Sequence, residues 1–145
     1  MEADRSRVAI KLQISIHDHG QMEETTTKTT GYLYNQNTKD VLTYEEQATD
    51  TDGMIKNMLT IQPDKVSIKR SGAVNMHQQF HLEQTSESVF QHAYGAIHME
   101  TYAKAIDYRP FDAATPGKLT IAYLVRLNGQ DPREHQLTLT ISNTH

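Results

Sequence analysis

Apolar residues alternate with polar ones along most of this 145-residue chain, and this period of two restricts its fold more than any other feature. Residues 8–16 are the clearest case, with valine, leucine or isoleucine at every second position, and residues 119–127 and 137–141 repeat the pattern. Successive side chains of a β-strand point to opposite faces, so each run predicts a half-buried strand. No segment has the periodicity of a convincing amphipathic helix. We therefore predict an all-β protein.

Short turn signals separate the predicted strands. Asn128-Gly129 is the strongest hairpin signal, because both positions tolerate a positive φ. Gly31 interrupts a threonine-rich strand, and we interpret it as a corner at which that strand curls. Eight to ten strands joined by short turns predict a single antiparallel up-and-down β-barrel over residues 1–145, since closure removes both sheet edges. A β-sandwich is the alternative, but it usually needs longer crossovers.

The composition excludes several classes of function. The absence of cysteine rules out disulfides, thiol nucleophiles and thiolate metal sites. With a net charge of −4 and neither half of the chain basic, a general nucleic-acid surface is disfavoured. No apolar run approaches the roughly 20 residues of a membrane helix, so we expect no membrane partner. The charged N-terminus leads directly into an alternating strand, which favours a cytoplasmic protein over a secreted one.

Residues 65–82 predict two strands that fold back at Ser71-Gly72, with polar Arg70 and Gln78 on otherwise apolar faces. A buried guanidinium must be paired. A structural carboxylate such as Glu45 or Glu100 is the favoured partner, ahead of a ligand carboxylate or phosphate. Thr101 lies on an aliphatic face in the same way, so Gln78 and Thr101 are expected to bond to each other, to the backbone or to buried water.

The eight histidines do not predict a metal site. His77 and His81 are four residues apart on one extended strand, about 13 Å, so they cannot share a metal ion. His17 and His19 could chelate across a turn, but no further ligands are evident. We expect no metal and no cofactor. Because no nucleophile, phosphate-binding or dinucleotide motif is present, no catalytic residue is assigned and an enzyme is the least favoured class.

Three segments carry a resemblance to a known family. They are Thr30-Gly31-Tyr32-Leu33-Tyr34, the segment from Arg70-Ser71-Gly72-Ala73-Val74 to Phe80, and Tyr94-Gly95-Ala96-Ile97 with the residues up to Thr101. In this order they resemble the YwiB-like proteins, small uncharacterised bacterial β-barrel proteins mainly from Firmicutes. The resemblance implies a lipocalin-like or calycin-type barrel and a bacterial origin. It implies no reaction and no catalytic residues.

Two classes of function remain. The first is a non-enzymatic protein whose barrel holds one small, partly apolar molecule, because barrels of this strand number have room for packed side chains or for one ligand. The predicted lining consists of Arg70, Met76, Gln78, Phe80, Met99, Thr101 and Tyr123. The second is an interaction module, such as a homodimer, with outward apolar residues Ala122, Leu124 and Ile106 at the interface.

Overall fold

The computed structural model describes residues 4–36, 38–48, 53–92, 95–112 and 114–144. All the regular secondary structure in these residues is β-strand. The strands are β1 (Asp4–Asp18), β2 (Gln21–Gln36), β3 (Lys39–Gln47), β4 (Met54–Ile61), β5 (Lys65–Gly72), β6 (Met76–His81), β7 (Thr85–His92), β8 (Gly95–Arg109), β9 (Gly117–Leu127) and β10 (Arg133–Ser142). In this part of the chain, no helix has the length and apolar character needed to cross a membrane.

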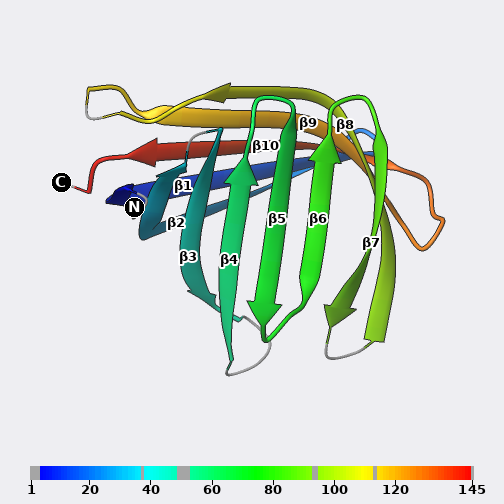
Figure 1. Cartoon of the computed structure of the whole chain (residues 1–145). Coiled ribbons are helices and arrows are strands. Elements are labelled where there is room, and N and C mark those ends of the chain that lie inside the picture. Colours follow the sequence, from blue (N-terminus) through cyan, green and yellow to red (C-terminus); the bar gives the residue numbers. More distant parts are fainter. Residues whose placement is uncertain (1–3, 37, 49–52, 93–94, 113, 145) are drawn as a thin grey trace.

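All ten strands form one antiparallel sheet in the order β6-β5-β4-β3-β2-β1-β10-β9-β8-β7. The sheet curls into a nearly closed barrel, in which β3 to β7 cross β1, β9 and β10 on the opposite side (Figure 1). The predicted all-β, up-and-down barrel is therefore confirmed.

Strands β6 and β7 are the two edge strands of the sheet, and a seam remains where they approach each other. The main-chain N–H of Glu83 donates to the carbonyl oxygen of Ala103 at 2.8 Å, beside an isolated parallel bridge between Leu82 and Ala103. The Gln78 amide on β6 also donates to the Thr101 hydroxyl on β8 at 2.9 Å. Individual bonds thus close the seam in place of a regular strand ladder.

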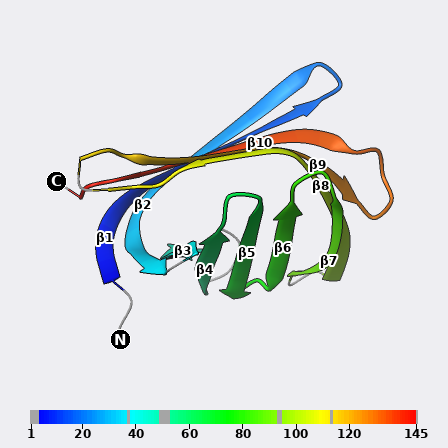
Figure 2. The ribbon, with the colours of Figure 1, turned by 45° about the horizontal axis from the view of Figure 1, so that its top comes forward.

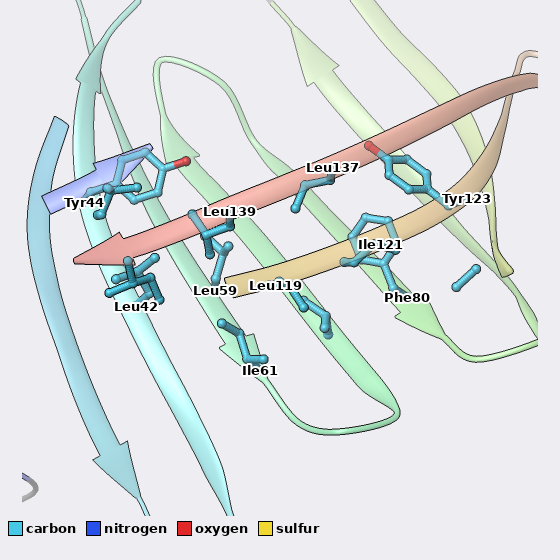
Figure 3. Close-up of a cluster of buried hydrophobic side chains, with 14 of the residues drawn as sticks. Leu42, Tyr44, Leu59, Ile61, Phe80, Leu119, Ile121, Tyr123, Leu137 and Leu139 are labelled. Carbon is cyan, nitrogen blue, oxygen red and sulfur yellow. The ribbon is translucent and has the colours of Figure 1, made fainter. Parts of the chain in front are cut away.

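The inward-facing residues of both sides meet in the main hydrophobic core (Figure 3), and a second, smaller cluster consists of Ala48, Ile55 and Val74. Phe80 on β6 is fully buried and packs edge-on against Tyr123 on β9, with ring centroids 4.8 Å apart. Toward one end of the barrel, the Tyr108 hydroxyl on β8 donates to the Asp40 carboxylate on β3 at 2.6 Å. This bond connects strands from opposite walls of the barrel.

Gly31 forms the predicted corner in β2. A Cβ at this position would lie 2.2 Å from the carbonyl oxygen of Thr43, so only glycine lets β3 approach this closely. Strand β2 pairs with β1 throughout, but with β3 only from Tyr32 to Gln36. Before the corner, β2 therefore leaves β3 and extends with β1 as a hairpin beyond the barrel body (Figure 2).

The predicted turn at Ser71-Gly72 is wrong. Both residues continue β5 and pair with β4, Gly72 lying opposite Ile55, and the chain reverses over residues 73–75. Gly72 adopts a φ of +104°, and a Cβ there would lie 2.4 Å from the carbonyl oxygen of Met54. The glycine thus permits a close approach within the strand and does not mark its end.

A β-bulge in β8 corrects another prediction. The register with β9 shifts between Ala103 and Ala105, and the extra residue reverses the faces of the following side chains. Ala105 is consequently exposed, and Ile106, predicted to face outward, packs against the core. Ala122 and Leu124 are half-buried and belong to neither core cluster among the described residues.

Candidate functional site

A pocket of about 230 Å³ enters the barrel interior between the β1–β2 hairpin and the strands β3 to β6. Strand alternation supplies its walls, because each contributing strand directs every second side chain inward. The lining residues are Leu12, Ile14, Thr27, Tyr44, Glu46, Asn57, Leu59, Ile68, Arg70, Met76, Gln78, Tyr123 and Leu137. Most of these side chains are apolar, and the two charged ones belong to a single polar cluster.

That polar cluster consists of Glu46, Asn57 and Arg70, from the adjacent strands β3, β4 and β5. Arg70 Nε donates to Asn57 Oδ1 at 3.1 Å, and Arg70 Nη2 donates to Glu46 Oε1 at 2.9 Å. Asn57 Nδ2 donates to the same carboxylate oxygen at 3.0 Å. The pairing register places Asn57 directly opposite Arg70, which brings the three groups together. Charge at the site is therefore balanced within the protein.

Arg70 pairs with a carboxylate as expected, but the partner is Glu46 in place of Glu45 or Glu100. Along β3, alternation directs Glu46 inward and leaves Glu45 exposed on the outer face. Glu100 lies near Arg126 instead, with 3.7 Å between Oε2 and Nε. Of the three kinds of partner expected for Gln78 and Thr101, the structure shows the first, a hydrogen bond between the two side chains.

The structure places the seven predicted lining residues in two groups. Arg70, Met76, Gln78 and Tyr123 line the pocket. Phe80, Met99 and Thr101 are buried in the barrel away from this lining.

Sequence reasoning missed the pocket residues Glu46 and Asn57. Apolar residues occupy both phases of β4, so its inward face could not be chosen from the pattern alone. The structure turns Ile55, Leu59 and Ile61 inward, and the same phase buries Asn57, which is only 3% exposed. Assigning the face of Ile55, Leu59 and Ile61 to the interior would also have predicted that Asn57 is buried.

The aromatic groups around the pocket are neutral at physiological pH. Burial raises the pKa of Tyr123. Burial also raises the pKa of Tyr44 to about 12, an effect that the charge of Glu46 increases and the charge of Arg70 reduces. The centroids of the His135 and Tyr123 rings are 5.1 Å apart. Burial, with a smaller contribution from the charge of Arg133, lowers the pKa of His135 to about 4. The pocket thus combines neutral aromatic surface with one internally paired charge cluster.

The neutral state of His135 predicts a pH-dependent stability. The pKa of His135 is about 4 in the folded state and about 6.5 in an unfolded chain, so between these values the unfolded chain binds a proton that the folded chain does not. The free energy of unfolding should fall as the pH decreases from 6.5 to about 4 and should gain nothing from this group above that window. Urea denaturation across this range measures the effect. His135→Gln should flatten the profile, and an unchanged slope in this variant would contradict the assignment.

Two other histidines, His77 and His98, lie in local surface contacts. Ligand atoms of Glu87, His98 and Glu100 lie within 4.8 Å of one another on the outer face of β7 and β8. Glu87 Oε1 and His98 Nε2 are 3.7 Å apart, and Glu100 also lies beside the guanidinium of Arg126. His77 bonds to Ser67 at 2.8 Å. These contacts account for the cluster as paired surface charge.

Comparison with known proteins gives a consistent family assignment. The family model described as "Domain of unknown function (DUF1934)" matches residues 10–139. The uncharacterised β-barrel protein YwiB of Bacillus subtilis (strain 168) is 26% identical over 133 residues, covering 92% of this chain and 91% of YwiB. The crystal structure of YwiB from Bacillus subtilis superposes with a TM-score of 0.85 at 24% identity, covering 97% of this chain and 94% of the other. The chain therefore belongs to the DUF1934 family and shares the β-barrel fold of YwiB.

Proposed function

We propose that the protein binds one small, partly apolar molecule in the 230 Å³ pocket, as a non-enzymatic ligand carrier or sensor with a calycin-like use of its barrel. The observation that supports this most directly is the form of the pocket. Aliphatic and aromatic walls surround a single polar cluster, which is the usual composition of a small-molecule site. The volume lies below the roughly 300–1,000 Å³ of typical ligand pockets, so the proposed ligand is small.

The polar cluster favours a neutral ligand over an anionic one. Arg70 is already neutralised by Glu46, and a ligand carboxylate would place two negative charges beside one guanidinium. The cluster engages Arg70 through Nε and Nη2, and a guanidinium carries five N–H donors. A carbonyl or ether oxygen could accept one of the others while its apolar portion contacts Leu12, Ile14 and Leu137.

Native mass spectrometry of gently purified protein, followed by extraction of the bound species, tests this proposal. A neutral molecule that copurifies in a one-to-one ratio is the expected result. The neutral fluorescent probe N-phenyl-1-naphthylamine provides a second measurement, and its binding should weaken at least tenfold in Ile14→Trp, which fills the pocket.

Ser15→Trp is the matched control, because alternation turns Ser15 away from the pocket lined by its neighbour Ile14. This variant should bind the probe like the original protein. Failure to detect a copurifying molecule, combined with equal probe binding by both tryptophan variants, would refute binding in this pocket.

A cytoplasmic location is part of the same proposal. A chain without cysteine gains nothing from an oxidising compartment, which supports this location. Fractionation of the native host cells, with immunodetection of the protein, measures it directly.

A further inference from the structure

The β1–β2 hairpin leaves a long strand edge unpaired. Over Gln21–Thr30, β2 pairs with β1 on one side, and no strand in the described part of the chain pairs with its other side. This edge contains no proline and no bulge, the two backbone devices that usually protect an exposed edge. Five of its ten residues are threonine, which favours strand pairing. The edge is therefore suited to receive another strand.

The turn at the hairpin tip determines which backbone groups face outward. Asp18 pairs with Gln21 around His19 and Gly20, whose φ values of 51° and 80° fit a two-residue type I′ turn. In such a hairpin, the residues flanking the turn exchange their backbone hydrogen bonds with each other. Gln21 thus directs its backbone groups to β1, and the even-numbered residues from 22 to 30 direct theirs to the free edge.

We propose that two copies of this chain pair along this edge, antiparallel about a two-fold axis at Thr26, so that the two barrels share one continuous sheet. A two-fold axis perpendicular to the sheet keeps the outer faces of both copies on the same side, so even-numbered residues face even-numbered residues. Thr26 then lies opposite the partner's Thr26. All outward-pointing backbone groups from Glu24 to Lys28 gain partners.

Charge complementarity selects this register and favours a second copy as the occupant. With the axis at Thr26, Glu24 lies opposite the partner's Lys28, and the symmetry repeats the ion pair. An axis at Thr25 or Thr27 forms neither pair: Lys28 would face the partner's Met22 or Thr26. Both Glu24 and Lys28 are exposed in the single chain and available for these contacts. A self-complementary arrangement of this kind is what an isologous interface requires.

A groove continues the same edge. It opens where β2 leaves β3, has a volume of about 640 Å³, and is lined by residues including Thr30, Tyr32, Lys56, Met58 and Lys69. In the proposed register the partner's Met22 lies opposite Thr30, at the start of this groove. Met22 is 59% exposed in the single chain and Met58 41%, so the pairing offers cover for apolar surface on both copies.

Cysteine crosslinking tests the register, because the natural chain contains no cysteine. Two directly opposed Thr26 Cα atoms would be about 5.5 Å apart, within the span of a disulfide. Thr26→Cys should therefore give a covalent dimer under mild oxidation. Met22→Cys is the control, since its two copies would be about 27 Å apart along the strands and should remain uncrosslinked. Equal crosslinking of both variants, or none in Thr26→Cys, would overturn the register.

Sedimentation equilibrium of the full chain tests the charge pairs. Glu24→Lys and Lys28→Glu should each weaken dimerisation by about tenfold or more, because each creates two like-charge pairs. The double variant restores opposite charges and should recover the original affinity, and Glu23→Lys, which faces Thr29 of the partner subunit, should change it little. A monomer at every concentration, or a dimer that shows no rescue in the double variant, would overturn the proposal. Neither outcome depends on ligand binding in the barrel.

Discussion

Replacing Phe80 with alanine is expected to lower the free energy of unfolding by about 3–5 kcal/mol, the range for deletion of a large buried aromatic side chain. Phe80 is fully buried, and its ring packs edge-on against Tyr123 on β9. The substitution removes this cross-barrel contact and leaves a cavity that the rigid strands can fill only in part. Urea denaturation monitored by circular dichroism measures the loss.

Met58→Ala is the matched control for this experiment. Met58 is a large apolar residue on β4, and it is 41% exposed on the outer face. Its truncation should cost well under about 1 kcal/mol, because little apolar surface returns to water. Comparable losses in the two variants would show that Phe80 does not hold the two sides of the barrel together.

Replacing Arg70 with methionine is expected to cost about 1–3 kcal/mol, because it leaves Glu46 and Asn57 without their main hydrogen-bond donor. Arg70 and Glu46 side chains are 26% and 30% exposed, so water compensates part of the loss. Chemical denaturation of Arg70→Met, Glu46→Gln and the double variant forms a thermodynamic cycle. The double variant should lose less than the sum of the single losses.

Lys69→Met provides the control for the arginine, since the neighbouring lysine is exposed on the outer face of the same strand. Its effect should lie within about 0.5 kcal/mol. Strict additivity of Arg70→Met and Glu46→Gln would contradict an energetic coupling between the two groups, despite their 2.9 Å contact.

The alternation of apolar residues was sufficient to predict the barrel and much of its interior. Arg70 and Gln78 were placed inward because they continue apolar series, and the structure confirms both. A period of two gives the faces of a strand only where it is uninterrupted, so it could not follow β8 across the bulge, where Ile106 changes face. It also could not distinguish a glycine that ends a strand from Gly72, whose role is set by the nearby backbone of β4.

The polar cluster shows a second limit. Glu46 and Asn57 come together with Arg70 only through the pairing of three strands, and their position depends on register. A single sequence gives the face of a residue within its own strand but not its neighbour across the sheet. The kind of partner for Arg70 was therefore predictable from the need to neutralise a guanidinium, whereas the choice between adjacent glutamates was not.

The strand order has a consequence for how the barrel assembles. Eight of the nine ladders join strands that are consecutive in the chain, and the ninth joins β1 to β10. Each consecutive hairpin can form locally, but the β1–β10 ladder must bring together the first and the last strand of the sheet, which run side by side in Figure 1. Formation of the complete sheet therefore waits for the last strand to leave the ribosome, and until then the edge of β1 remains open to other chains.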